Sequence, residues 1–126
     1  MSTLTSNRPV ALLALDLVGV AVFVLVGRRS HDESGALVGF LGTAWPFAVG
    51  TAIGWLATRA WTRPAALVPT GVGSWLGAVV GGLVLRRLVG GGTPLSFVIV
   101  TTLVLGALLL GWRAVVAARV RTRASA

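Results

Sequence analysis

One carboxylate, Asp16, lies in the middle of an apolar run of eighteen residues, Val10–Gly27. An ionised carboxylate at the centre of a membrane-spanning helix costs about 2.5–3.5 kcal/mol on insertion scales. Such a residue usually faces the protein interior and has a partner or a function. Arg113 is one candidate partner, because its side chain and that of Asp16 lean toward each other if their helices are adjacent. Arg59 is the alternative partner.

Three roles for Asp16 remain open at the level of sequence. It could be half of a buried structural ion pair, or a protonated side chain that hydrogen-bonds a serine or threonine. The third role is a functional one, on a proton or ion path through the membrane. The structural roles are the more common ones for a single buried carboxylate, and we favour them.

Two arginine pairs, Arg28-Arg29 and Arg86-Arg87, end the first and third apolar runs. Arginine at the end of a span can extend its charged group to lipid headgroups while its stem stays in the apolar region. This is the simpler interpretation of both pairs. The alternative is a shared anion site, because the two pairs end helices that run in the same direction.

His31 is the only histidine, and Asp32 and Glu33 follow it in the loop after the first run. This trio is a candidate for proton sensing or metal binding, but a single loop histidine is more typical of an exposed side chain. The chain has no cysteine, no phosphate-binding Walker loop and no pair of residues suited to nucleophilic catalysis. We therefore predict no enzyme activity, no cofactor and no metal site.

The remaining sequence predicts the helices that must position these residues. Apolar residues make up 56% of the 126 residues, charged residues only 11%, and mean hydropathy is +0.91. A soluble domain would need more charge on its surface. We predict an all-α, polytopic membrane protein, a compact bundle that forms a single domain over residues 1–126. Its four transmembrane helices are expected at residues 10–27, 36–57, 65–85 and 94–112, between polar or basic tails at 1–9 and 114–126.

The distribution of arginines predicts the orientation. Four spans place both termini on one side, which carries seven arginines against four on the other side. Because arginine-rich short loops and tails stay in the cytoplasm, both termini are expected there. The same clusters suit contacts with anionic lipids in the surrounding bilayer, and they lack the single basic face of a nucleic-acid-binding protein.

Small residues at helical spacing predict how the helices pack. Membrane helices associate where glycine and other small residues let their backbones approach closely. Each span has such a stripe, and a second glycine face leaves homo-oligomerisation open; protein partners are not predicted. Arginine pairs recur 58 residues apart, and the Gly-Trp pairs Gly54-Trp55 and Gly111-Trp112 recur 57 residues apart. Duplication of a two-helix unit is one interpretation of these spacings, and the enrichment of both residue types at membrane interfaces is the other.

With these residues laid out, the chain resembles the domain of unknown function 3054 family of small prokaryotic membrane proteins over about residues 10–113. The resemblance implies a four-helix, multi-pass protein of the prokaryotic inner (plasma) membrane and implies no activity. It points to Asp16, Arg28, His31, Arg86 and Arg113 as the polar residues of interest. It rests on the following residues: Asp16, Gly27-Arg28, His31, Trp45-Pro46-Phe47, Gly54-Trp55, Arg63-Pro64, Gly71, Trp75, Gly81, Arg86 and Gly111-Trp112-Arg113.

Two functions from different classes are consistent with the sequence. The favoured one is a structural or accessory membrane protein that acts through lipid or protein partners. The alternative is a small oligomeric transporter or channel that uses Asp16 and the outer arginine pairs on a proton or anion path. A structural role predicts a dry, paired Asp16, whereas transport predicts an Asp16 that faces a wet cavity.

Overall fold

The computed structural model describes the backbone of residues 2–29 and 36–125 and the side chains of residues 9–27 and 39–122. His31 lies outside the described residues, as do Asp32 and Glu33, and the side chain of Arg28 is not described. Throughout the described ranges the regular structure is helical and no strand occurs. The predicted all-α architecture is confirmed.

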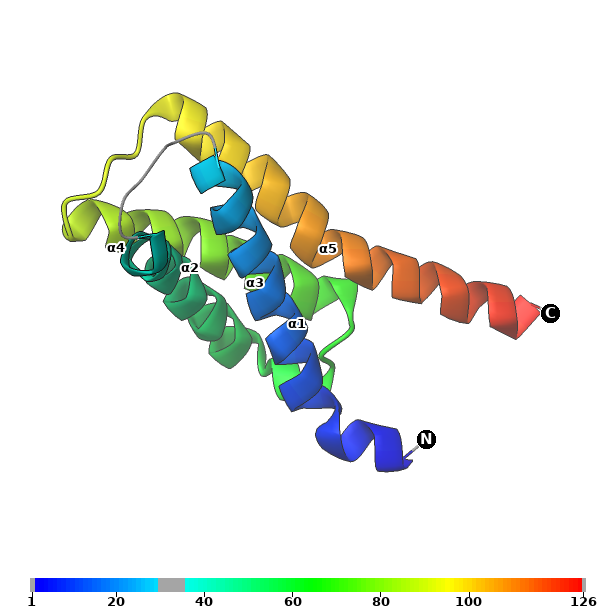
Figure 1. The fold of residues 1–126 in the computed structure, drawn as a ribbon. Helices are drawn as coiled ribbons and strands as arrows, with labels where there is room; N and C mark the ends of the chain where they lie inside the picture. Colours follow the sequence, from blue (N-terminus) through cyan, green and yellow to red (C-terminus); the bar gives the residue numbers. More distant parts are fainter. Residues whose placement is uncertain (1, 30–35, 126) are drawn as a thin grey trace.

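Four apolar helical spans make up the molecule (Figure 1). By length and composition each can cross a membrane, and they cover Pro9–Gly27, Gly39–Thr58, Leu67–Leu88 and Leu95–Thr122. The elements in chain order are α1 (Ser2–Arg29), α2 (Ala36–Thr58), η1 (Ala60–Thr62), η2 (Leu67–Gly71), α3 (Val72–Leu76), η3 (Gly77–Gly81), α4 (Gly82–Leu88) and α5 (Leu95–Ser125).

The first and last helices are longer than predicted. Helix α1 begins at Ser2 and contains Pro9, and α5 continues to Ser125. The first membrane span, predicted at 10–27, agrees with the observed Pro9–Gly27. The helices themselves continue into the polar tails expected at 1–9 and 114–126, and α5 extends well beyond residue 112. Hydropathy marks where the apolar run ends, but alanine and arginine are good helix formers and extend α5 beyond it. At 31 residues α5 measures about 46 Å, which exceeds the hydrocarbon thickness of a bilayer.

The third span is one helix built from several segments. Val68 has an extended backbone (φ −125°, ψ 129°), so regular helix begins at Pro69, later than the predicted start at residue 65. A residue that precedes proline is kept out of the helical region by the proline ring, which explains this boundary. The span ends at Leu88 instead of residue 85, and its last turn contains Arg86 and Arg87. Cations in that turn interact favourably with the carbonyl end of the helix.

Helix α2 packs against the third span at backbone contact distance. A Cβ atom added at Gly54 would overlap the carbonyl oxygen of Gly73, and one added at Gly50 would overlap that of Gly77. These contacts confirm the prediction that small residues mark the buried face of both helices.

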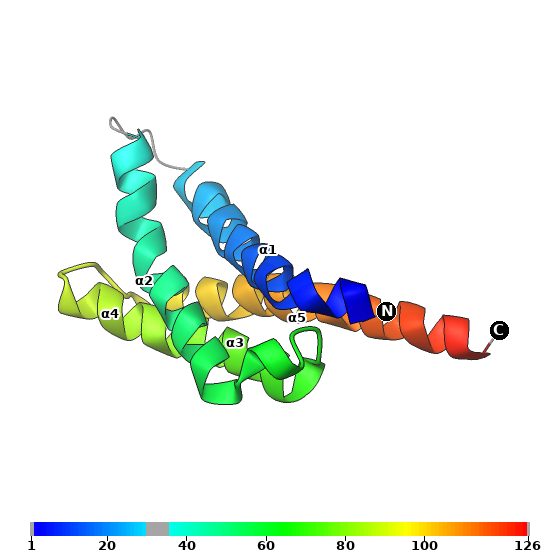
Figure 2. The ribbon, with the colours of Figure 1, turned by 90° about the horizontal axis from the view of Figure 1, so that it is seen from below.

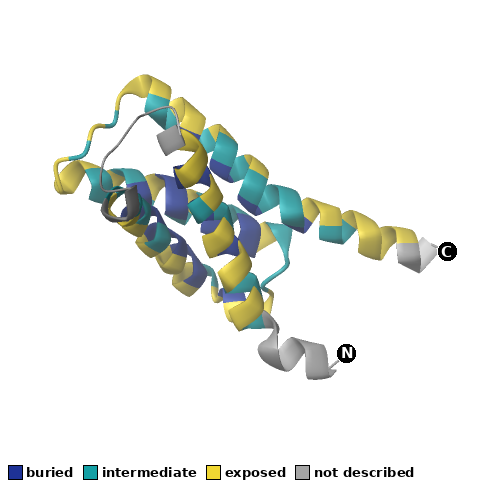
Figure 3. Ribbon diagram, in the orientation of Figure 1, coloured by how far each residue is buried: buried dark blue, intermediate teal, exposed yellow. Residues whose placement is uncertain are grey.

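Both termini lie at one end of the bundle, and the loop between α4 and α5 lies at the other (Figures 1 and 2). Buried residues line the inner faces of the helices, while the outer faces are exposed (Figure 3). Large apolar side chains are exposed on the outside of all four spans, including Val18, Leu41, Ile53, Val80 and Leu103. An apolar exterior of this kind suits a lipid environment.

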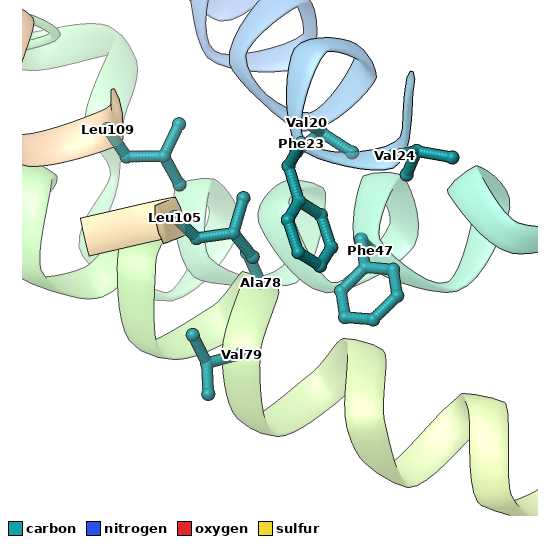
Figure 4. Close-up of a cluster of buried hydrophobic side chains, with 8 residues drawn as sticks. All are labelled: Val20, Phe23, Val24, Phe47, Ala78, Val79, Leu105 and Leu109. Atoms are coloured by element: carbon teal, nitrogen blue, oxygen red, sulfur yellow. The ribbon is translucent and has the colours of Figure 1, made fainter. Parts of the chain in front are cut away.

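The apolar core joins all four spans (Figure 4). Three aromatic rings, those of Phe23, Phe47 and Phe97, contact one another with centroids 5.3–6.2 Å apart. The two pairs that include Phe47 are edge-to-face, and such pairs add to the stabilisation from buried area. Phe97 is partly buried and packs against this core. The buried residues of the core are Val20, Phe23, Val24, Phe47, Ala78, Val79, Leu105 and Leu109.

Candidate functional site

The carboxylate of Asp16 is fully buried and lies at the centre of a polar cluster. Its Oδ1 atom accepts hydrogen bonds from Trp112 Nε1 and Arg113 Nη1, both at 2.9 Å. Its Oδ2 atom accepts from Trp55 Nε1 and Ser74 Oγ at 2.8 Å and from Arg113 Nη2 at 2.7 Å. Five hydrogen bonds from α2, α3 and α5 thus converge on one side chain of α1.

Arg113 forms a two-pronged ion pair with Asp16 and is itself fully buried. Two further donors are used, since Nη1 reaches the carbonyl of Leu109 at 2.8 Å and Nε that of Pro64 at 3.1 Å. The guanidinium carbon lies 4.3 Å from the centroid of the Trp112 ring. Charge-assisted and two-pronged bonds are the strongest hydrogen bonds that side chains make.

Small residues make room for this cluster. Gly71 faces Arg113, and a Cβ atom at that position would lie 2.9 Å from Cδ of the arginine and 3.0 Å from a methyl carbon of Leu110. The close approach of Gly54 and Gly73 brings the next residues along their helices, Trp55 and Ser74, to the same carboxylate. The glycines that set the helix spacing therefore also position the donors.

The arrangement neutralises and saturates the carboxylate. An ionised carboxylate has about four lone-pair sites, and Asp16 accepts five hydrogen bonds. Because both members of the pair are 0% exposed, solvent does not reach either charge. The cluster can hold helices together, and in this conformation it offers no open coordination position to an ion or a substrate.

Arg59 does not take part in this cluster. It is exposed, in a left-handed backbone conformation (φ 53°) that starts the η1 turn after α2. Of the two candidate partners of Asp16, the structure therefore selects Arg113. The hydrogen bond from Ser74 accompanies the ion pair and does not replace it.

Arg86 and Arg87 both bond to the loop between α4 and α5. Arg86 donates from Nε to the carbonyl of Gly92 at 2.8 Å, and its guanidinium carbon lies 4.9 Å from the centroid of the Phe97 ring. Arg87 donates from Nη1 to Thr93 Oγ1 at 3.2 Å. The alternative of an anion site shared with Arg28 and Arg29 falls outside the described side chains. Among the described residues, no group of His, Asp, Glu or Cys could hold a metal ion.

Trp55 and Trp112 were not expected at the site. The sequence predicts them as interfacial anchors, which is wrong, because their indole nitrogens donate to Asp16. Trp45 and Trp75 lie deeper in their apolar runs, which predicts that both rings pack against glycines. Trp45 is instead 42% exposed. Trp75 fits its predicted packing role, since its ring covers Gly106 and its Nε1 donates to the carbonyl of Thr102 at 3.0 Å.

Both tryptophans of the site belong to pairs that recur in the sequence. Asp16 and its donor Ser74 are 58 residues apart, the same separation as the two arginine pairs. The two indoles that bind Asp16 belong to the two Gly-Trp pairs. A duplicated two-helix unit would bring equivalent positions together around a shared axis, and here they meet at one carboxylate.

Comparison with known proteins gives a family without an assigned activity. No curated protein and no solved structure matches the chain. One family model, that of the proteins of unknown function DUF3054, matches residues 13–116, a stretch that contains Asp16, Trp55, Ser74, Trp112 and Arg113. The chain therefore belongs to the DUF3054 family.

Proposed function

We propose that this protein is a structural or accessory component of the prokaryotic plasma membrane, with four spans and both termini in the cytoplasm. It acts through lipid or protein partners and catalyses no reaction. The observation that carries this proposal is the closed ion pair between Asp16 and Arg113. Both side chains are shielded from solvent and their charges neutralise each other. Hydrogen bonds to Asp16 come from each of the other three spans.

The alternative, a proton or anion path through Asp16, would need this pair to open during each transport cycle. Opening it would leave two charges without partners in a low-dielectric interior, at a cost of several kcal/mol for each ion. A structural pair needs no such step. The geometry therefore favours a role for Asp16 in holding the bundle together over a role in transport.

Membrane placement and orientation are supported by the distribution of side chains. The outer faces of the spans are apolar, and the end that carries the termini also carries Arg59, Arg63, Arg119 and Arg121. Short arginine-rich segments are retained in the cytoplasm. Accessibility of cysteines introduced one at a time at Ser96 and at Thr122 to a membrane-impermeant thiol reagent in intact cells tests this orientation, because only the former should be labelled.

A double-mutant cycle on the purified protein in detergent tests the structural role. Asp16→Leu and Arg113→Leu should each lower the free energy of unfolding by about 3–5 kcal/mol, because each leaves one buried charge unpaired. The double variant should recover most of this loss. An Asp16–Arg59 cycle is the matched control and should show no coupling, because Arg59 is exposed and takes no part in the hydrogen bonds to Asp16.

The transport alternative gives the opposite result. Asp16→Leu would then be neutral or stabilising, because a group retained for transport does not contribute to the fold. Proton or chloride flux in liposomes that contain the wild-type protein, abolished by Asp16→Leu in a folded variant, would overturn the structural proposal.

A further inference from the structure

An open groove lies between α4 and the start of α5, at the end of the bundle opposite the termini. Its volume is about 300 Å³, at the lower end of the range for small-molecule sites. Six of the described residues line it, and the lining is almost entirely apolar. Arg87 and Thr93 line the groove next to the loop between α4 and α5, and this end is called its mouth here. The apolar residues are Leu83, Val84, Leu88 and Val98.

The groove runs from the membrane interface into the apolar region. Arg87 lies one residue before the end of the third span, and Thr93 lies just before α5 begins. Leu83 and Val84 are one turn deeper on the same face of α4, because residues three and four apart lie above one another on a helix. A ligand that fits both parts has an anionic head at the interface and an apolar tail.

Among the described residues, no carboxylate pairs with the exposed Arg87 side chain. Asp16 is the one acidic residue in the described part of the chain, and Arg113 neutralises it. The described contact of the Arg87 side chain is a 3.2 Å hydrogen bond from Nη1 to Thr93 Oγ1, which leaves guanidinium donors for a second group. Arginine binds phosphate through two parallel hydrogen bonds, and its side chain here is exposed.

Arg86, the neighbouring residue, has a different role. Its Nε bonds to the carbonyl of Gly92, its own carbonyl accepts from the amide of Gly91 at 2.8 Å, and its guanidinium covers the Phe97 ring. These contacts fold the loop that carries Thr93. One arginine of the pair therefore fixes the mouth of the groove and the other is available to a ligand.

We propose that this groove binds one anionic phospholipid, with its phosphate at Arg87 and Thr93 and an acyl chain along Leu83, Val84, Leu88 and Val98. The charge of the mouth selects the headgroup, and the apolar walls select the chain. The inference rests on the membrane placement proposed above and names the lipid class and the position on the protein.

Native mass spectrometry of the purified protein tests this site, with phosphatidylglycerol and phosphatidylcholine as probes. The wild-type protein should bind one phosphatidylglycerol about fivefold more tightly than phosphatidylcholine. Both lipids offer a phosphate to Arg87, but the choline cation of phosphatidylcholine offsets its attraction to the exposed guanidinium. Arg87→Gln should remove this preference. Val84→Trp fills the groove and should weaken the binding of the first molecule of either lipid.

Two variants serve as matched controls. Arg63→Gln removes an exposed arginine at the other end of the bundle, and Leu103→Trp adds the same ring to an exposed apolar position of α5. Both should bind phosphatidylglycerol like the wild-type protein. Circular dichroism and thermal unfolding identify any variant that fails to fold, and Arg87→Lys, which keeps the charge, should retain a partial preference.

Three results would overturn the proposal. The first is that Arg87→Gln keeps the wild-type preference for phosphatidylglycerol. The second is that Arg63→Gln loses this preference as completely as Arg87→Gln does. The third is displacement of the lipid by millimolar inorganic phosphate, which would assign the mouth to a free anion. Release of the wild-type protein from membranes by alkaline carbonate is a separate result that would contradict the membrane placement itself.

Discussion

The guanidinium of Arg113 meets the carboxylate of Asp16 through two parallel hydrogen bonds, Nη1 to Oδ1 at 2.9 Å and Nη2 to Oδ2 at 2.7 Å. The two residues are 97 positions apart, on the first and last spans of the chain. Trp55 and Ser74 attach the second and third spans to the same carboxylate. A single charge thereby fixes the relative positions of all four helices.

Replacing Arg113 with lysine should destabilise the protein although the charge is kept. Lysine has no planar fork, so it cannot bond to both carboxylate oxygens while also reaching the carbonyls of Leu109 and Pro64. We expect Arg113→Lys to lower the free energy of unfolding by about 2–4 kcal/mol, close to the cost of leaving hydrogen-bonded charges under-satisfied. Titration with denaturing detergent measures this loss. Arg119→Lys, at an exposed position of the same helix, should have no effect.

Removing one indole donor should cost less than removing the arginine. Trp55→Phe keeps an aromatic ring but deletes the hydrogen bond to Oδ2, and we expect a loss of about 1.5–3 kcal/mol, the usual value for a bond to a charged group. Trp61→Phe is the control, since Trp61 is 46% exposed. Equal stabilities of the two variants, measured by the same detergent titration, would show that the indole bond contributes little.

The fold could be predicted because the bilayer imposes a length on each apolar run. Four such runs predict four helices irrespective of how they pack. The ends of α1 and α5 were predicted less well, because hydropathy reports the edge of the membrane and not the end of the helix. Val68 shifted the start of the third span for a local steric reason, its position before Pro69.

The site could be predicted only in part. Asp16 and Arg113 stand out in the sequence because charge in an apolar span is costly. Trp55 and Trp112 do not stand out, because tryptophan near the end of a span is common at the membrane interface whether or not it donates to a buried group. Ser74 has no signal of its own, since a serine in a membrane helix can bond to its own backbone. Their roles depend on which helices are neighbours, which composition does not encode.

The close contact between α2 and the third span predicts that alanine destabilises the protein at one glycine of α2 and not at another. In Gly54→Ala the new methyl group would overlap the carbonyl of Gly73, so the helices must separate and the bonds of Trp55 and Ser74 to Asp16 must lengthen. We expect a loss of about 2–3 kcal/mol or more, in line with overpacking of a tight interface.

Gly42→Ala is the matched control, because nothing lies within 4 Å of a Cβ atom added there. It should be neutral or stabilising by up to about 1 kcal/mol, the difference in helix propensity between the two residues. Thermal unfolding in detergent would compare the two variants directly. If Gly54→Ala were as stable as Gly42→Ala, the backbone contact could not be what sets the helix spacing.

At Thr101 we predict a substitution that stabilises the protein. The Thr101 hydroxyl is buried. Among the buried side-chain nitrogen and oxygen atoms of the described residues, only this one has no hydrogen-bond partner. Thr51, Thr58 and Thr102 instead bond to the carbonyl four residues earlier in their own helices. An unpaired buried hydroxyl costs about 1–3 kcal/mol, and valine has nearly the same shape without the polar group. Thr101→Val should therefore stabilise the protein by about 1 kcal/mol.

Thr70→Val, the same substitution at another fully buried threonine, should destabilise by a similar amount. The Thr70 hydroxyl donates to the carbonyl of Arg63 at 2.6 Å, and its loss leaves that carbonyl without this donor. A detergent titration of both variants beside the wild-type protein should show a higher unfolding midpoint for Thr101→Val and a lower one for Thr70→Val. Because the substitution is identical at both sites, a change in side-chain chemistry alone would shift the two midpoints in the same direction. Opposite shifts would show that hydrogen-bond satisfaction, and not apolarity, determines the stability of this interior.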